Sequence, residues 1–135
     1  MKNTNRRNVA AVVAALGTAL LVAGCGDDGG SGKSDEDQIR AVVQAQEDAI
    51  RAGDAEAFLA TFCEESRKNF ESSVTDESLA EVNSAGETNA EVTKIEVHGD
   101  DATVTISGTI GGEDQGESAN SYLKVDGEWK DCTSG

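Results

Sequence analysis

The stretch Ala49-Ile50-Arg51-Ala52-Gly53-Asp54-Ala55-Glu56-Ala57-Phe58 is the part of the sequence from which the fold is best predicted. Gly53 suits the left-handed position just past the end of a helix, and Asp54 suits the N-cap of a helix that begins immediately afterwards. The stretch therefore predicts two helices that follow one another with almost no loop between them.

Apolar residues recur at helical spacing on both sides of this junction. The first helix is expected to begin at a cap formed by Ser34 or Asp35 and to stop near Ala52, and its apolar positions are Ile39, Val42, Val43, Ala49 and Ile50. The second has apolar residues at steps of three and four, namely Ala55, Phe58, Leu59, Phe62 and Cys63. A third, weaker helix is expected from about Asp76 to Val82.

The pattern changes to alternation at about Glu91, and it predicts a meander of strands. Turns are expected at 98–101, at 111–117 and at Asp126-Gly127, a dipeptide typical of tight hairpins. The alternation predicts three inward-facing sets: Thr93, Ile95 and Val97; Ala102, Val104 and Ile106; Ala119, Ser121, Leu123 and Val125. A last short strand is expected at 128–132.

Helices followed by about four strands predict an α+β domain. In such a domain the N-terminal helices pack on one curved antiparallel sheet, which wraps the long helix and gives a cystatin-like cone.

Both ends of this domain carry a family resemblance. The stretch 49–58 resembles the start of a nuclear-transport-factor-2-like or SnoaL-like domain, and 122–132, with its Asp-Gly turn before Trp129, resembles the last hairpin of the same families. The resemblance covers about residues 36 to 132. It implies a cone with a pocket, in a fold whose members include isomerases, dehydratases and binding modules, and it points to small lipoproteins of actinobacterial type.

The N-terminal segment has the parts of an export signal. Lys2, Arg6 and Arg7 precede an uncharged, mostly apolar run of signal-peptide length from Val9 to Ala23, shorter than the roughly twenty residues that span a membrane. Leu21-Val22-Ala23-Gly24-Cys25 resembles a bacterial lipobox. The resemblance implies cleavage before Cys25 and a diacylglycerol with palmitate-type chains on its sulfur. A retained short anchor or a buried core helix is the alternative.

Three segments follow from this interpretation. Residues 1–24 are the expected signal peptide, 25–35 the lipidated cysteine and a flexible tether without apolar side chains, and 36–135 the folded domain. The expected location is the extracytoplasmic face of the cell membrane, held by the lipid anchor, because two acyl chains hold a protein stably on a bilayer.

The charge of the chain argues against several partners. The formal net charge is −15, and all 26 acidic residues follow Cys25. Nucleic acid and anionic lipid headgroups would both be repelled, so no nucleic-acid partner is expected. The acids are dispersed and lack the spacing of a calcium loop, so the charge most simply keeps the domain soluble.

The cysteine count gives a further prediction. With Cys25 lipidated, Cys63 and Cys132 remain as an even pair in an oxidising compartment, and we expect them to form a disulfide. Two buried free thiols are the alternative.

Catalytic chemistry finds little support in the sequence. His98, the only histidine, lies in an expected turn, so histidine-based catalysis or metal binding is not expected, and no cofactor is implied. The isomerases of the family use buried carboxylates and a Tyr. The predicted inward sets contain no carboxylate, and one Trp, one Tyr and three Phe among many small residues predict a filled interior, with a shallow pocket as the alternative.

Two functions remain open at this level. The first is a non-catalytic module that binds a partner protein or a small apolar ligand; the second is an isomerase- or dehydratase-type enzyme with a pocket inside the cone. A cavity lined by two or more buried acids, or by a Tyr–Asp pair, would overturn the non-catalytic interpretation, whereas a pocket closed by Phe58, Phe62 and Ile106 would count heavily against the enzyme. The candidate pocket residues, each with core packing as its alternative role, are Phe58, Phe62, Tyr122 and Trp129.

Overall fold

The computed structural model describes residues 32–134, so the expected signal peptide, Cys25 and most of the expected tether lie outside the described residues. Four helices are followed by four strands. The helices are α1 (Asp35–Ala52), α2 (Ala55–Ala60), α3 (Glu64–Phe70) and α4 (Asp76–Ala85). The strands are β1 (Asn89–His98), β2 (Asp101–Ile110), β3 (Glu113–Val125) and β4 (Glu128–Asp131).

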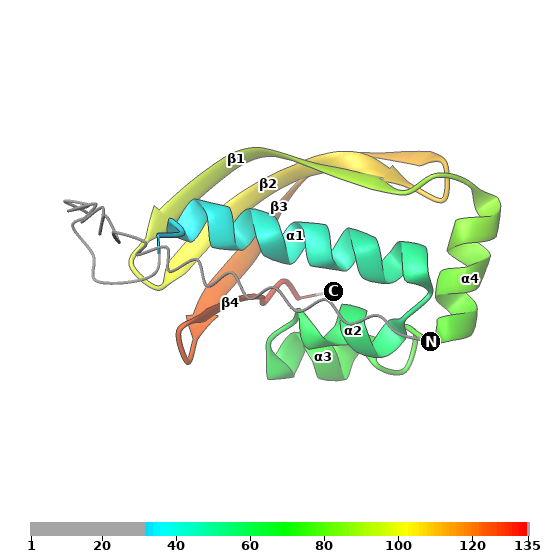
Figure 1. The fold of residues 1–135 in the computed structure, drawn as a ribbon, viewed down its shortest axis with the longest axis horizontal. Helices are drawn as coiled ribbons and strands as arrows, with labels where there is room; N and C mark the ends of the chain where they lie inside the picture. The colour runs from blue at the N-terminus through cyan, green and yellow to red at the C-terminus, as the bar shows by residue number, and fades with distance from the viewer. Residues whose placement is uncertain (1–31, 135) are drawn as a thin grey trace, which may run out of the picture.

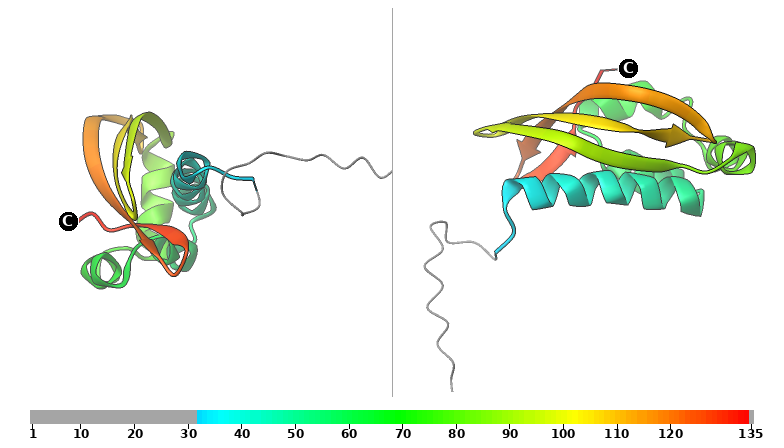
Figure 2. Two further views of the ribbon diagram at one scale, coloured as in Figure 1. Left: turned by 90° about the vertical axis from the view of Figure 1, so that its left-hand side faces the viewer. Right: turned by 90° about the horizontal axis from the view of Figure 1, so that it is seen from above.

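The strands form one antiparallel sheet in the order β1-β2-β3-β4. This sheet arches over α1, which lies along its concave face, while α2 and α3 lie beside β4 and α4 stands at the far end of α1 (Figures 1 and 2). The predicted α+β class, with helices on one curved sheet, is therefore confirmed.

The junction between α1 and α2 forms as predicted. Gly53 adopts the left-handed conformation with φ 68°, and its N–H is bonded to the carbonyls that end α1. The Asp54 side chain accepts a hydrogen bond of 2.9 Å from Ala57 N and caps α2. Asn83 of α4 donates to the Ile50 carbonyl at 2.6 Å, which attaches α4 to the same end of α1.

The expected second helix is shorter than predicted. It ends at Ala60, and a separate helix, α3, starts at Glu64. The backbone between them pairs with β4 instead: Cys63 N donates to Asp131 O at 2.9 Å, and Asp131 N donates to Thr61 O at 3.0 Å. These tertiary hydrogen bonds override the helical periodicity of the segment.

The inward face of β3 is the opposite of the predicted one. Tyr122 is fully buried, whereas Leu123 and Val125 are 38% and 43% exposed. Tyr122 lies opposite the buried Ala102 of β2, and residues opposite each other in an antiparallel pair share a face. A large aromatic ring on the same face as the β2 core side chains decides the orientation, which alternation alone left ambiguous.

A bulge changes the predicted face of β1. The register shifts between Val92 and Lys94, so Thr93 is exposed while Val92, Ile95 and Val97 pack against the core. One extra residue in a strand reverses the facing of everything before it. The bulge therefore exchanges Thr93 for Val92 in the predicted inward set.

The core lies between α1 and the sheet. Its buried members are Ile39, Val43, Ala102, Val104, Tyr122 and Trp129. The structure joins Cys63 and Cys132 in a disulfide with a Cα–Cα distance of 5.2 Å, which supports the predicted pairing. Among residues 32–134, no helix is both long and apolar enough to cross a membrane.

Candidate functional site

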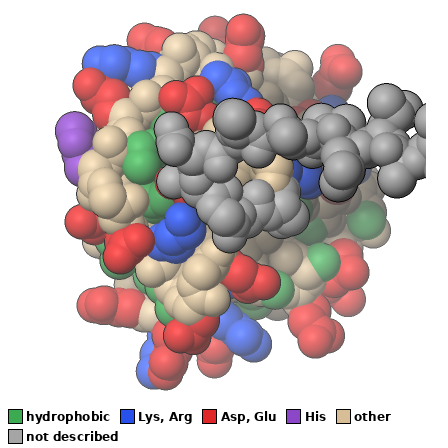
Figure 3. All heavy atoms as spheres, turned by 60° about the vertical axis from the view of Figure 1, so that its left-hand side comes forward, with side chains coloured by type: hydrophobic (Ala, Val, Ile, Leu, Met, Phe, Trp, Pro, Cys, Tyr) green, Lys and Arg blue, Asp and Glu red, His purple; other side chains and the backbone are tan. Residues whose placement is uncertain are grey.

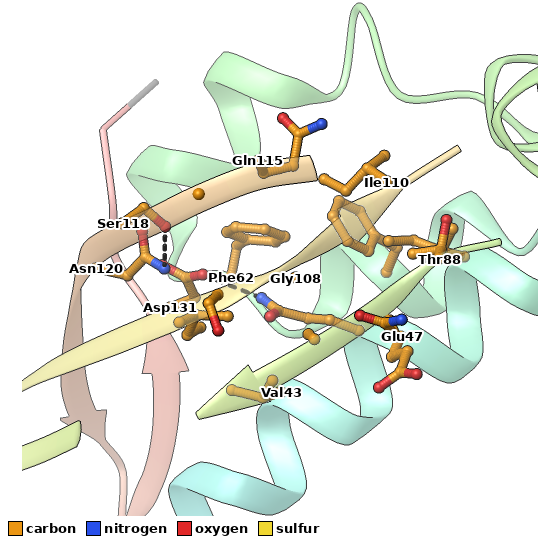
Figure 4. Close-up of a pocket in the computed structure, with 18 residues that line it drawn as sticks. Val43, Glu47, Phe62, Thr88, Gly108, Ile110, Gln115, Ser118, Asn120 and Asp131 are labelled. Atoms are coloured by element: carbon orange, nitrogen blue, oxygen red, sulfur yellow. Dashed lines mark hydrogen bonds between the residues drawn. The ribbon is translucent and has the colours of Figure 1, made fainter. Parts of the chain in front are cut away.

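A pocket of about 220 Å³ opens between α1, α2 and the concave face of the sheet (Figure 4). We call it the α1–sheet pocket. Its apolar walls come from α1, from α2 and the residues after it, and from β1 and β2; the side chains are Val43, Ile50, Phe58, Phe62, Ala90, Ile106 and Ile110. The interior is therefore hollow at this end of the cone, which agrees with the alternative of a pocket and not with an interior filled throughout.

Asp131 is the most deeply buried charged group in the wall of the pocket. It is only 6% exposed, because β4 directs it inward between the sheet and α1. Its Oδ2 accepts a hydrogen bond of 3.1 Å from Gln46 Nε2, and its Oδ1 accepts one of 2.9 Å from Thr133 N. Neutral donors thus hold the carboxylate in place.

Tyr122 lies behind Asp131 and does not reach the pocket surface. The two residues are directly opposite each other in the β3–β4 ladder, and the Tyr122 hydroxyl lies 3.5 Å from Gln46 Oε1. Burial of the phenol raises the pKa of Tyr122, and the neighbouring Asp131 carboxylate, by its charge and by a hydrogen bond, raises it further. Tyr122 is therefore a neutral phenol that positions Gln46 and Asp131.

Glu47 supplies a second buried carboxylate to the pocket, from α1. The residue is 8% exposed, and it forms an ion pair with Arg51 one turn later. Arg51 is half-exposed and also donates to the carbonyl of Thr88 at 3.4 Å. Glu47 is consequently neutralised from outside the pocket, whereas the hydrogen-bond partners of Asp131 are uncharged.

Aromatic rings build the wall that α2 contributes. The centroids of Phe58 and Phe62 lie 5.1 Å apart in an edge-to-face arrangement, and Phe62 lies 5.2 Å from Phe70 of α3. Such pairs hold ring orientations more firmly than area burial alone. Phe62 also pairs through its backbone with Asp131, so the aromatic wall and the buried acid are coupled.

The four candidate pocket residues are divided between two places. Phe58 and Phe62 lie in the wall of the α1–sheet pocket, but Tyr122 and Trp129 do not line it. Trp129 is 3% exposed and donates to Asp35 Oδ1 at 3.0 Å. Part of it borders a second depression of about 330 Å³ between α1, the end of α2 and β4.

The sequence analysis missed the polar residues of the pocket. Glu47 occurs one turn after Val43, so a polar residue on the apolar stripe of the helix was the available signal. Asp131 alternates with Trp129, which places both on the inner face of β4. The expectation that no carboxylate faces inward is therefore wrong, because it omitted the last strand and the helix.

Outside this pocket the charged groups do not form an obvious site. No three His, Cys, Asp or Glu side chains of residues 32–134 are placed to hold a metal ion. His98 is exposed at the end of β1. Figure 3 shows acidic side chains spread over the visible face among other residues, with several Lys and Arg side chains between them.

Comparisons with known proteins locate this arrangement among known folds. No protein-family model and no curated protein matches the sequence. A protein of Shewanella baltica described as NTF2-like and of unknown function superimposes with a TM-score of 0.58 at 17% identity, covering 71% of this chain and 86% of that one. The chain has the nuclear-transport-factor-2-like fold.

Two further solved structures agree. An NTF2-like protein of unknown function from Shewanella oneidensis gives a TM-score of 0.51 at 17% identity, over 76% of this chain and all of that one. A Mycobacterium tuberculosis protein of unknown function gives 0.51 at 19% identity, over 70% of this chain. This chain spans 66% of the length of the mycobacterial protein. At these identities the likeness describes the fold alone.

Proposed function

We propose that this domain binds a small, largely apolar molecule in the α1–sheet pocket. The observation that carries the proposal is the pocket itself: seven apolar side chains line about 220 Å³, and its polar side chains come from α1, the sheet and the residue before β1, with Glu47, Thr88 and Asp131 buried. An apolar cavity of roughly 150 Å³ is enough to take up benzene. A ligand with one ring and a few further atoms therefore matches the size of this pocket.

Filling the pocket tests the proposal. Ala90 lines the pocket from β1, whereas Ala119 lies exposed on β3 and does not line it. In ligand-observed NMR we expect benzyl alcohol to bind the wild-type domain and the Ala119→Leu control. It should not bind the Ala90→Leu variant, in which the larger side chain fills the pocket. Equal binding to both variants, or none to the wild-type domain, would contradict the proposal.

A second candidate function is acid–base catalysis on the bound molecule, and Asp131 is the observation that favours it. The pocket contains two buried acids, and Tyr122 lies against one of them, an arrangement that favours an enzyme of the isomerase or dehydratase type. Asp131 would act as the base, with Gln46 and Tyr122 as positioning residues, because both face its carboxylate.

Proton exchange tests this second candidate without knowledge of the natural substrate. Acetophenone has the size of the pocket and a methyl group beside a carbonyl. Deuterium exchange at that methyl, faster with the wild-type domain than in buffer and absent with Asp131→Asn, would support catalysis. Exchange at the buffer rate, in a sample that binds acetophenone, would leave the binding function alone.

We further propose that the full chain is an extracytoplasmic lipoprotein, anchored through Cys25 after removal of residues 1–24. The support is the lipobox-like Leu21–Cys25 sequence after a signal-like segment. Expression of the full chain in a bacterium, followed by membrane fractionation and mass spectrometry, tests this proposal. A lipid-modified N-terminal Cys25 is expected, and Cys25→Ser should remain unlipidated; an unmodified wild-type protein would contradict the proposal.

A further inference from the structure

The buried carboxylate of Asp131 carries an inference about the chemical class of the ligand, which rests on the proposed binding function. Asp131 lines the α1–sheet pocket and is 6% exposed. Within residues 32–134, no Lys, Arg or His forms an ion pair with it. A buried charge of this kind is costly unless a counter-charge or several donors compensate it.

The donors present compensate only part of this cost. Gln46 Nε2, Thr133 N and the Tyr122 hydroxyl take lone pairs of the carboxylate, and all three donors are neutral. A carboxylate offers about four lone-pair sites. A protonated amine in the pocket would use a further site and would supply the missing positive charge.

The remaining wall of the pocket suits a cation as well. None of the residues that line it is Lys, Arg or His, and its other acid, Glu47, is paired with Arg51 from outside the pocket. Phe58 and Phe62 present aromatic rings, which attract cations. The net charge of −15 also draws cations toward the domain from a distance. An anionic ligand would find no basic side chain in the pocket wall and would be repelled by the buried carboxylate, the aromatic faces and the net charge of the chain.

We infer that the α1–sheet pocket selects small apolar amines in their protonated form, with the ammonium group at Asp131 and the apolar body between the Phe58–Phe62 wall and the sheet. Three probes of nearly equal size separate charge from shape: benzylamine, benzyl alcohol and benzoate. At neutral pH they are a cation, a neutral molecule and an anion.

The affinities of the three probes for the wild-type domain, measured by titration in NMR, test the inference. We expect benzylamine to bind roughly tenfold or more tightly than benzyl alcohol, because a charged hydrogen bond is stronger than a neutral one, and benzoate to bind weakest. Benzyl alcohol binding as tightly as benzylamine would overturn the inference and leave the proposed function intact. Failure of all three to bind would count against the proposed function itself.

Two variants complete the experiment. Asp131→Asn should bring benzylamine down to the affinity of benzyl alcohol while benzyl alcohol still binds. Asp101→Asn makes the same change at an exposed position at the start of β2, away from the pocket. This control variant should keep the preference for benzylamine over benzyl alcohol. An unchanged preference in Asp131→Asn would overturn the inference. If Asp131→Asn does not fold, the ranking on the wild-type domain still decides.

Discussion

Tyr122 and Asp131 lie directly opposite each other on β3 and β4, both buried on the inner face of the sheet. Gln46 connects them, since its amide donates to Asp131 and its carbonyl oxygen lies 3.5 Å from the Tyr122 hydroxyl. This group joins the core of the domain to the wall of the α1–sheet pocket. Changes at Tyr122 are therefore expected to reach both stability and binding.

The first prediction concerns alkaline pH. The pKa of Tyr122 is raised above its ordinary value of 10.0, so its contribution to stability is complete below pH 10.0 and is lost as pH rises above that value. Tyr122 is the only Tyr, so ultraviolet absorbance reports its ionisation directly. The phenolate signal should appear only together with loss of the circular dichroism of the fold.

Tyr122→Phe serves as the matched variant in that titration. It removes the hydroxyl and keeps the ring, so it should cost about 1 kcal/mol at neutral pH and weaken the alkaline dependence. A phenolate that forms in the wild-type domain while the native dichroism persists would contradict this prediction.

The second prediction concerns acid pH and the start of α1. Asp35 Oδ1 accepts hydrogen bonds from Lys124 Nζ at 2.7 Å and from Trp129 Nε1 at 3.0 Å, and the Lys124 bond, followed by that of Trp129, lowers the pKa of Asp35. The resulting stability is complete above the ordinary value of 3.8 and is lost as pH falls through the lowered pKa.

Asp35→Asn should therefore destabilise the domain at pH 7, by about 1 kcal/mol or less because the site is partly exposed, and by progressively less in acid. Denaturant unfolding followed by the fluorescence of Trp129, the only Trp, measures this difference. Asp37→Asn, an exposed acid in the same helical turn, controls for the helix dipole. Equal effects of the two variants would refute the role of the Asp35 contacts.

The third prediction concerns the disulfide. Cys63 and Cys132 are separated by 69 residues, and closing a loop of that length stabilises a fold by about 4 kcal/mol in the chain-entropy model. Cys63→Ser/Cys132→Ser should lose stability of this order in denaturant unfolding, and Cys25→Ser should lose none. Peptide mapping without reductant should show the linked pair; two freely alkylated thiols would exclude it.

The fourth prediction concerns Gly108, which lines the pocket at an irregularity in the β2–β3 register. A Cβ at this position would lie 2.2 Å from the backbone oxygen of Asn89, so the strands would have to separate. Gly108→Ala should destabilise the domain by about 1–3 kcal/mol and weaken the binding of benzyl alcohol in the pocket. Ser107→Ala, one residue earlier, should be nearly neutral; similar stability of both variants would contradict this explanation.

The start and end of α1 and the start of α2 could be predicted because their signals are local, whereas α3 was not predicted. Gly53 and Asp54 specify the α1–α2 junction through backbone conformation and capping, which depend on near neighbours only. The Asp126-Gly127 turn is similar, since both residues adopt positive φ. The end of α2 was mispredicted because Thr61 and Cys63 bond to Asp131, almost seventy residues away.

The pocket could be predicted only in part. Phe58 and Phe62 were found because aromatic residues on a helical stripe indicate an inner face. Asp131 and Glu47 were missed because a charged residue on an inner face contradicts the pattern that defines that face. Burial of such a group depends on partners such as Gln46 and Arg51, which are identified only by packing.

The sequence by itself determined the α+β class, the α1–α2 junction and the Asp-Gly hairpin, because propensity, capping and turn chemistry act over a few residues. The lipobox-like segment ending at Cys25 lies outside the described residues and stays a prediction. Only the tertiary structure decided which face of β3 is buried, where β1 bulges, and that Asp131 reaches the pocket. These features depend on the register between strands and on the volume of the side chains that meet across the sheet. The spacing of apolar residues within a single strand predicts neither of them.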